Sequence, residues 1–133
     1  LCNPIEYIPS MELPDEEYPM KMMTGRVLYH YNACAMTDKT EGLNEISGHS
    51  FIEINTEDAE RIGIKDGDRV KVSSRRGSIE TTANVSGKTN PGECWMPFHF
   101  LDGGANWLTS DALDSISSTP EYKVCAVKIE NTK

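Results

Sequence analysis

Residues 51–100 restrict the possible folds of this chain more than any other part of its sequence. The runs 51–54, 69–74, 78–85 and 94–100 are short and apolar or alternating, and clusters of Gly, Asp, Asn and Pro separate them. Alternation with period two predicts strands, and the separating clusters predict tight turns. Many short strands leave exposed edges unless the sheet closes on itself. We therefore expect a mainly β domain with short helices, built as a closed or nearly closed barrel.

Two helices and two further segments complete the expected secondary structure. A short helix follows the first strand, because Asn55 or Thr56 can cap it, acidic residues fill its first turn and Gly63 can end it. Apolar residues at helical spacing predict a second helix over residues 107–116. A final strand is expected from 122 to 129, and the polar residues 38–50 are expected to form a loop.

Residues 20–32, MKMMTGRVLYHYN, are expected to form one continuous strand before that loop. Because side chains alternate along a strand, Thr24, Arg26, Leu28 and His30 are then expected to share one face. A shared pocket for Arg26 and His30 follows from this alternation, although a single strand histidine is more often structural. From the residues alone, Arg26 is equally well explained as a solvated surface side chain.

Prolines recur every five residues at the start of the chain, at positions 4, 9, 14 and 19. This density excludes a helix, so residues 1–19 are expected to form an extended arm, followed by one domain over residues 20–133. Apolar residues within the arm suggest that it lies along a surface. Arg75 and Arg76 fall in a hairpin turn and are expected to face solvent or a neighbouring domain. The chain begins with Leu1 rather than methionine, which suggests a piece of a longer protein.

Composition excludes several classes of partner. The net charge is −8 and the pI is about 4.8, so a basic nucleic-acid-binding face is not expected. No apolar run is long enough to span a membrane. The four cysteines are far apart and form no CxxC pair, which favours buried or free thiols in a reducing compartment, the cytoplasm. Neither the cysteines nor the three histidines show the spacing of metal ligands, so no metal site and no catalytic residue is predicted.

Residues 97–109, PFHFLDGGANWLT, pose the main question about function. Gly103 and Gly104 either form an ordinary turn or let backbone amides approach a bound ligand. Asn106 also has two possible roles, because its side chain suits both the edge of a heterocyclic ring and the cap of the expected helix. The residues alone leave both alternatives open.

Three blocks in order carry a resemblance to a known family: MTGRVLYHYNACAMT, INTEDAERIGIKDGDRVKVSSRRGSIETTANV, and NWLTSDALDSISSTPEYKVCAVKIE. Together they resemble the C-terminal dinucleotide-binding domain of the molybdopterin oxidoreductases, the family of dimethyl sulfoxide reductase. The ending STPEYKVCAVKIE is most similar to that of formate dehydrogenase catalytic subunits. The resemblance covers about residues 20–130 and implies a double-psi β-barrel, a six-stranded closed barrel.

The resemblance also implies a function. In that family two molybdopterin guanine dinucleotides hold one molybdenum or tungsten atom, and this last domain contacts the cofactor from one side. The metal's ligand and an iron–sulfur cluster lie in earlier domains, so the chain is expected to be inactive alone. Its expected partners are the other domains of the same catalytic subunit and the electron-transfer subunits. The alternatives are a domain of a nitrate reductase, a small subunit of a formylmethanofuran dehydrogenase, or a non-enzymatic double-psi barrel that binds proteins.

The same resemblance assigns cofactor contacts to positions within the matching blocks. The TGR-like stretch and the PEYK stretch supply two groups of them, and the glycine-rich loop supplies the third. The expected cofactor-binding residues are Thr24, Gly25, Arg26, Leu28, His30, Gly103, Gly104, Asn106, Tyr122 and Lys123.

Overall fold

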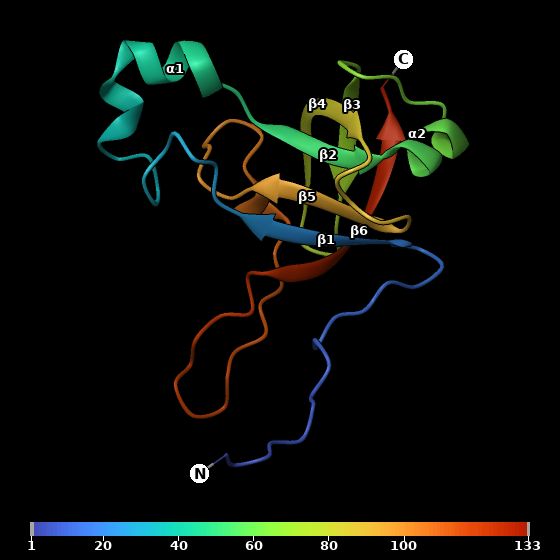
Figure 1. Cartoon of the computed structure of the whole chain (residues 1–133). Coiled ribbons are helices and arrows are strands. Elements are labelled where there is room, and N and C mark those ends of the chain that lie inside the picture. Colours follow the sequence, from blue (N-terminus) through green and yellow to red (C-terminus); the bar gives the residue numbers. More distant parts are fainter. Residues whose placement is uncertain (1, 133) are drawn as a thin grey trace.

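The computed structural model describes residues 2–132; Leu1 and Lys133, the outer ends of the expected arm and domain, lie outside this range. Within it the chain forms six strands, two α-helices and two short 3-10 helices (Figure 1). The strands are β1 Met20–Gly25, β2 Phe51–Asn55, β3 Arg69–Ser73, β4 Ser78–Ser86, β5 Glu93–Pro97 and β6 Val124–Asn131. The helices are η1 Thr37–Lys39, α1 Glu41–Ser47, α2 Thr56–Ile62 and η2 Ala105–Trp107.

The strands within residues 2–132 close into a barrel in the order β1-β5-β2-β4-β3-β6. β1 pairs with β5, and β2 with β4, in parallel. The remaining neighbours, including β1 with β6, are antiparallel. This is the six-stranded double-psi β-barrel that the sequence predicts. A closed barrel has no unpaired strand edge, which explains how such short strands are stable together.

Alternating side chains from the strands fill the barrel. Met20 and Met22 of β1 and Val70 and Val72 of β3 point inward, as period two requires. Each fully buried aliphatic side chain of this size contributes roughly 1.5–3 kcal/mol relative to exposure. The core is contiguous and belongs to this chain, so the barrel has what it needs to fold as a unit. No helix within residues 2–132 has the length and apolar character to span a bilayer.

Helix α2 forms as its sequence predicts. The Asn55 side chain accepts a hydrogen bond of 2.9 Å from the backbone N–H of Glu57, and Gly63 ends the helix at φ 76°. The buried Asp58 pairs with Arg61 and accepts a 2.6 Å hydrogen bond from the N–H of Gly92. This contact holds α2 against the turn before β5.

The continuous strand expected over residues 20–32 is wrong, because β1 ends at Gly25. Gly25, opposite Pro97, is the last residue of β1 in register with β5. The chain then turns repeatedly, with positive φ at Asn32 and Cys34. Arg26 and His30 therefore do not share a strand face.

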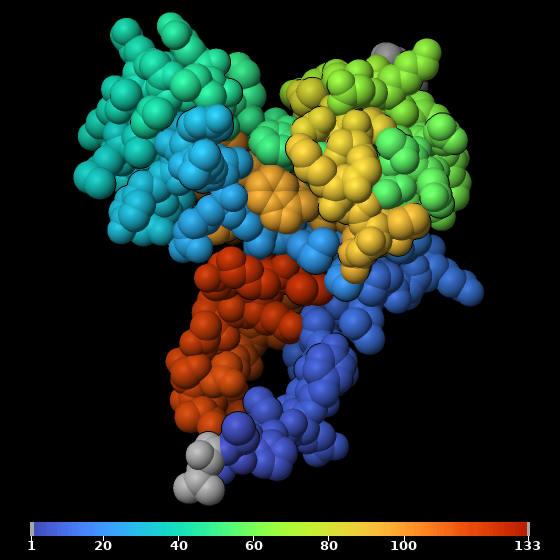
Figure 2. Space-filling view, viewed as in Figure 1, coloured from blue at the N-terminus to red at the C-terminus, as the bar shows by residue number. Residues whose placement is uncertain are grey.

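The expected loop over residues 38–50 is also wrong, since it contains most of η1 and all of α1. Helix α1 has no buried residue, so it lacks the apolar stripe by which amphipathic helices are recognised. Residues 26–47 form a lobe that stands off the barrel at the upper left of Figure 2. We call this segment the first excursion.

The helix expected over residues 107–116 is not formed. Helical structure here is limited to η2, and the chain then forms turns and an isolated bridge between Leu113 and Pro120. The Asp114 carboxylate accepts hydrogen bonds from the N–H groups of Ile116 and Ser117, which stabilises a turn in place of a helix. We call residues 98–123 the second excursion.

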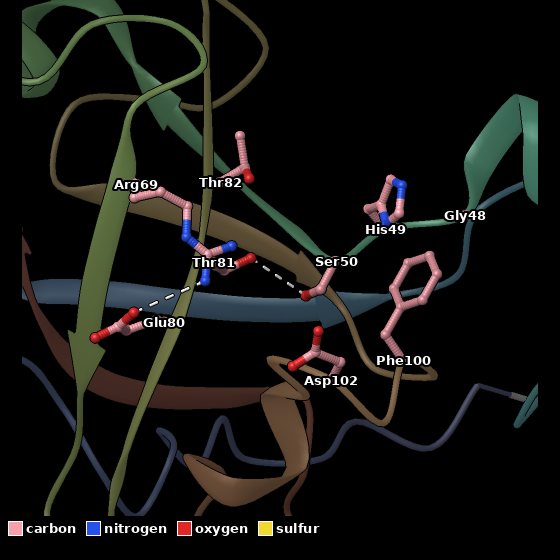
Figure 3. Close-up of a pocket in the computed structure, with 9 residues that line it drawn as sticks. All are labelled: Gly48, His49, Ser50, Arg69, Glu80, Thr81, Thr82, Phe100 and Asp102. Carbon is pink, nitrogen blue, oxygen red and sulfur yellow. Dashed lines mark hydrogen bonds and ion pairs between the residues drawn. The ribbon is translucent and has the colours of Figure 1, made fainter.

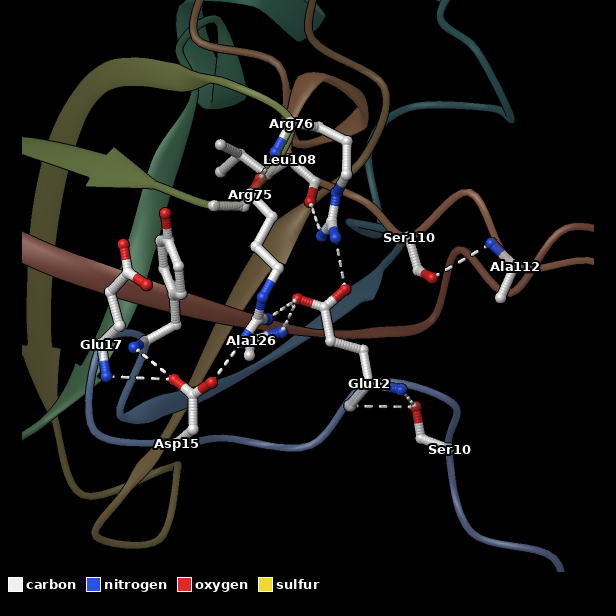
Figure 4. A network of polar contacts seen from close by, with 12 residues as sticks. Ser10, Glu12, Asp15, Glu17, Arg75, Arg76, Leu108, Ser110, Ala112 and Ala126 are labelled. Carbon is white, nitrogen blue, oxygen red and sulfur yellow. Dashed lines mark hydrogen bonds and ion pairs between the residues drawn. The ribbon is translucent and has the colours of Figure 1, made fainter.

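The N-terminal arm is extended, as its prolines predict, but acidic rather than apolar residues attach it. Ile5, Tyr7 and Ile8 are exposed. The nearly buried Glu12 carboxylate pairs with Arg75 at 2.8 Å and Arg76 at 2.5 Å, and Asp15 also pairs with Arg75 (Figure 4). The prediction that these arginines face solvent or a neighbouring domain is wrong for Arg76, which is half-buried against the arm; Arg75 is exposed as expected but also holds the chain's own arm.

Candidate functional site

The Phe98 ring, at the start of the second excursion, contacts cationic and aromatic side chains from two other segments. The Arg26 guanidinium lies 5.1 Å from the ring centroid, and the Lys123 ammonium lies 5.4 Å from it. The Tyr122 ring meets Phe98 edge-on at 6.1 Å. Lys123 also lies 4.9 Å from the Tyr122 ring. We call this group the Phe98 surface, together with Asn106, whose contact is described below.

Backbone contacts at the end of β1 bring these segments together. The Thr24 N–H donates to the carbonyl of Lys123 at 3.0 Å, and the Thr24 hydroxyl donates to the carbonyl of Tyr122 at 2.6 Å. The N–H of Phe98 donates to the carbonyl of Gly25 at 3.2 Å. A Cβ on Gly25 would lie only 2.6 Å from the indole nitrogen of Trp95, so glycine is required there. The TGR stretch thus positions the other parts of the surface.

Asn106 joins the same group through the second excursion. Its side-chain amide donates to the carbonyl of Phe98 at 3.2 Å, and the residue is exposed. The alternative role as a helix cap is wrong, because Gly104 occupies the cap position of η2 and Asn106 lies within that helix. The amide oxygen of Asn106 remains available at the surface for a ligand.

Gly103 and Gly104 shape the loop for the chain itself. Gly103 has φ 62°, and a Cβ there would lie 2.8 Å from the carbonyl oxygen of Glu80. A Cβ on Gly104 would collide with the carbonyl oxygen of Phe100. The carbonyl of Gly103 accepts a 2.8 Å hydrogen bond from Ser50. These contacts support the role of a turn and account for both glycines without a ligand.

Within residues 2–132, the ring and cation contacts of Phe98 do not include Leu28 or His30. Leu28 is 90% exposed, whereas His30 is buried. The His30 ring packs on His99 at 5.1 Å and on Phe100 at 5.8 Å. Burial, reinforced by His30, lowers the pKa of His99 and keeps its ring neutral. Burial also raises the pKa of the Cys34 thiol.

A polar pocket of about 200 Å³ lies between the barrel and residues Phe100 and Asp102 of the second excursion (Figure 3). Its lining includes Ser50, Asp102 and the ion pair between Arg69 and Glu80, 3.8 Å apart. Arg69 is already paired with an acid and Asp102 adds negative charge, so this pocket suits an anionic ligand less well than the Phe98 surface does.

The electrostatics of the Phe98 surface favour an anionic ligand with flat rings. Among residues 2–132 neither Arg26 nor Lys123 forms an ion pair with an acid. Both cations lie beside aromatic rings, in a chain of net charge −8. They offer a planar guanidinium fork and a point charge to phosphate. Phe98 was absent from the predicted set, and only its place in the FHF run pointed to it.

The structure thus defines a double-psi barrel domain with a cationic, aromatic surface at the end of β1. Residues 20–126 match the family model of the molydopterin dinucleotide binding domain. The chain belongs to this family. The barrel is similar to that of acetylene hydratase from Pelobacter acetylenicus, with a TM-score of 0.75 at 15% identity, over 86% of this chain and 18% of that one.

Curated relatives match nearly the whole of this chain, and they include both formate dehydrogenases and a nitrate reductase. F420-dependent formate dehydrogenase 2 subunit alpha of Methanococcus maripaludis is 46% identical over 128 residues, 96% of this chain and 19% of the relative. F420-dependent formate dehydrogenase subunit alpha of Methanocaldococcus jannaschii is 46% identical over 127 residues, with the same coverage. A nitrate reductase of Symbiobacterium thermophilum is 43% identical over 123 residues, 90% of this chain and 16% of the relative. The chain thus spans less than a fifth of the length of these relatives.

Proposed function

We propose that this chain is the cofactor-binding end of a cytoplasmic molybdenum or tungsten formate dehydrogenase, and that it binds molybdopterin guanine dinucleotide through the Phe98 surface. The convergence of Arg26 and Lys123 on Phe98, without an acidic partner within residues 2–132, carries the proposal. The family match and the similarity to formate dehydrogenase alpha subunits support it.

The residues present fit such a cofactor. Its diphosphate needs cations, which Arg26 and Lys123 supply, and its rings need donors, acceptors and apolar faces, which Asn106, Phe98 and Tyr122 supply. When bound in the parent subunit, two copies of the cofactor would hold the metal that exchanges two electrons with formate. This chain's role is to bind and orient one side of the cofactor and to exclude water. The iron–sulfur cluster and the metal's protein ligand belong to other domains of the parent subunit.

Substrate choice rests on residues outside this chain. This chain is 46% identical to a formate dehydrogenase alpha subunit and 43% identical to the nitrate reductase. Sequence identity in the barrel therefore distinguishes only weakly between the two kinds of enzyme. The nitrate reductase alternative therefore shares the cofactor surface and differs in the substrate channel.

An amide-resolved titration of the chain with guanosine diphosphate tests the surface. This probe carries the guanine and diphosphate of the dinucleotide. Shifts within residues 24–32, 98–109 and 120–124 are expected, and Arg26→Ala together with Lys123→Ala should abolish them. Shifts centred on the pocket of Arg69 and Glu80, or shifts that persist in the double variant, would refute the assignment. The variant Lys65→Ala with Lys71→Ala is the matched control, because both lysines are exposed on the barrel.

A further inference from the structure

Three side chains that are far apart in the sequence meet between the two excursions. His30 and Cys34 come from the first excursion, and His99 comes from the second. One ligand atom from each lies within 4.8 Å of the others, and the residues are 4%, 7% and 5% exposed, respectively. Among the described residues this is the group of His, Cys and carboxylate side chains that is arranged to hold an ion.

The hydrogen bonds of His30 prepare one of its nitrogens to act as a ligand. Its Nε2 lies 2.6 Å from the carbonyl oxygen of Ser47, so Nε2 carries the proton and donates. The lone pair is then on Nδ1, which accepts a 3.1 Å hydrogen bond from the Thr37 hydroxyl. A metal-bound histidine usually donates its other N–H to a carbonyl or carboxylate in this way.

His99 provides the second observation. Neither of its ring nitrogens has a hydrogen-bond partner among residues 2–132, although both are buried. An unsatisfied buried polar group is rare and costly in folded proteins. Ring packing against Phe100 at 4.1 Å does not satisfy these nitrogens. A metal ion between the excursions would satisfy one of them.

We propose that His30, Cys34 and His99 bind one zinc-class divalent metal ion, which fastens the first excursion to the second. Two imidazoles and one thiolate suit zinc, and a fourth position remains for water or another ligand. Metal–nitrogen bonds of about 2.0–2.1 Å and metal–sulfur bonds of about 2.3 Å place tetrahedral ligand atoms about 3.4–3.7 Å apart. Separations of up to 4.8 Å reach this range by side-chain rotation and small loop movements.

The site borders the Phe98 surface but shares no residue with it. The Phe98 and His99 rings meet edge-on at 6.4 Å; Phe98 also contacts Arg26 and Lys123, and His99 also contacts His30. The three proposed ligands are not residues of the Phe98 surface, so the proposal does not depend on cofactor binding. The ion would anchor the first excursion, which α1 does not do by packing because it buries none of its residues.

Cobalt(II), a spectroscopic substitute for zinc, tests the proposal on the 133-residue chain kept reduced and freed of metal. One equivalent should give the intense visible bands of a tetrahedral site and a near-ultraviolet thiolate charge-transfer band, and zinc should displace it. Cys34→Ser and His99→Gln should each weaken cobalt binding more than about 100-fold, since even the loss of an outer partner costs about 10–100-fold.

Matched controls separate the site from adventitious binding. Cys2→Ser and His49→Gln remove an exposed thiol and an imidazole outside the group, and both should leave binding unchanged. Far-ultraviolet circular dichroism checks that each variant is folded. Absence of a tetrahedral cobalt spectrum in the folded wild-type chain would overturn the proposal. Equal binding by Cys34→Ser and by Cys2→Ser would also overturn it.

Discussion

The barrel and the two excursions of this domain are held together by different forces. The strands bury methyl and methylene groups on the inside of a closed ladder. The excursions rely more on single hydrogen bonds, ring contacts and glycine-dependent turns; Ala105 and Leu108 of the second excursion reach the core, whereas Leu28 and Leu101 are almost fully exposed. Stability is thus concentrated in the barrel, while the Phe98 surface and the His30–Cys34–His99 group lie in the excursions. Binding groups on loops carried by a rigid scaffold are a general arrangement in proteins.

Truncation of a leucine or isoleucine should produce the largest difference in stability between the barrel and the excursions. Ile54→Ala, inside the barrel, should lower the free energy of unfolding by about 2–5 kcal/mol, because it removes buried methylene groups and leaves a cavity. Leu101→Ala, in the second excursion, should change it by less than about 0.5 kcal/mol. Urea denaturation measures both. Equal losses would mean that the exposed Leu101 contributes as much to stability as a core residue does.

Removal of the arm's carboxylate should have the next largest effect. Glu12→Gln weakens the ion pairs with Arg75 and Arg76 and the hydrogen bond to the N–H of Ala126, so we expect a loss of about 2–3 kcal/mol. Amide exchange of the arm should accelerate as well. Asp15→Asn is the control, with a smaller loss because its carboxylate is exposed. A fully protected arm in the Glu12 variant would contradict this attachment.

Two glycine substitutions compare the excursions with each other. Gly103→Ala forces a Cβ into positive φ and against the carbonyl of Glu80, so a loss of about 1–2 kcal/mol is expected. Gly42→Ala, in α1, meets no atom within 4 Å and should stabilise the chain by about 0.5–1 kcal/mol through helix propensity. Thermal unfolding distinguishes the signs. The same sign for both variants would remove the basis for assigning Gly103 to a turn.

Thiol labelling should show the same contrast without mutation. Burial raises the pKa of Cys94, and it raises that of Cys125 to about 12, so neither barrel thiol should react in the folded state. Cys2 is exposed and should react at once. Cys34 should react at an intermediate rate in the metal-free chain, through local opening of the first excursion. Mass spectrometry at intervals gives the order in which the thiols are labelled. If Cys34 is labelled as slowly as Cys94, the first excursion is as stable as the barrel, which would contradict the contrast.

The sequence predicted the barrel because its signals are local. Alternation identified β3 and β4, and Asn55 and Gly63 marked the ends of α2. The excursions were mispredicted because nonlocal or side-chain contacts decide them. β1 keeps its register with the distant strand β5 only as far as Gly25, and Asp114 competes with the backbone of the expected helix.

The candidate site was predicted only in part, for the same reason. Arg26, Asn106 and Lys123 were expected in one site from the family blocks, and the fold brings them to Phe98. His99 was not proposed as a ligand, since residue 99 meets residues 30 and 34 only after the barrel closes. No spacing rule could have revealed that group. The contacts of the predicted residues with the cofactor itself remain a prediction.

The cofactor content of the full-length subunit tests the central proposal most directly. Arg26→Ala with Lys123→Ala should leave a folded subunit with most of its molybdopterin dinucleotide lost, measured as released pterin and nucleotide per mole of protein. The control variant with Lys65→Ala and Lys71→Ala should retain the wild-type content. Equal cofactor content in the two variants would contradict the assignment of the Phe98 surface as the site where this domain holds its ligand.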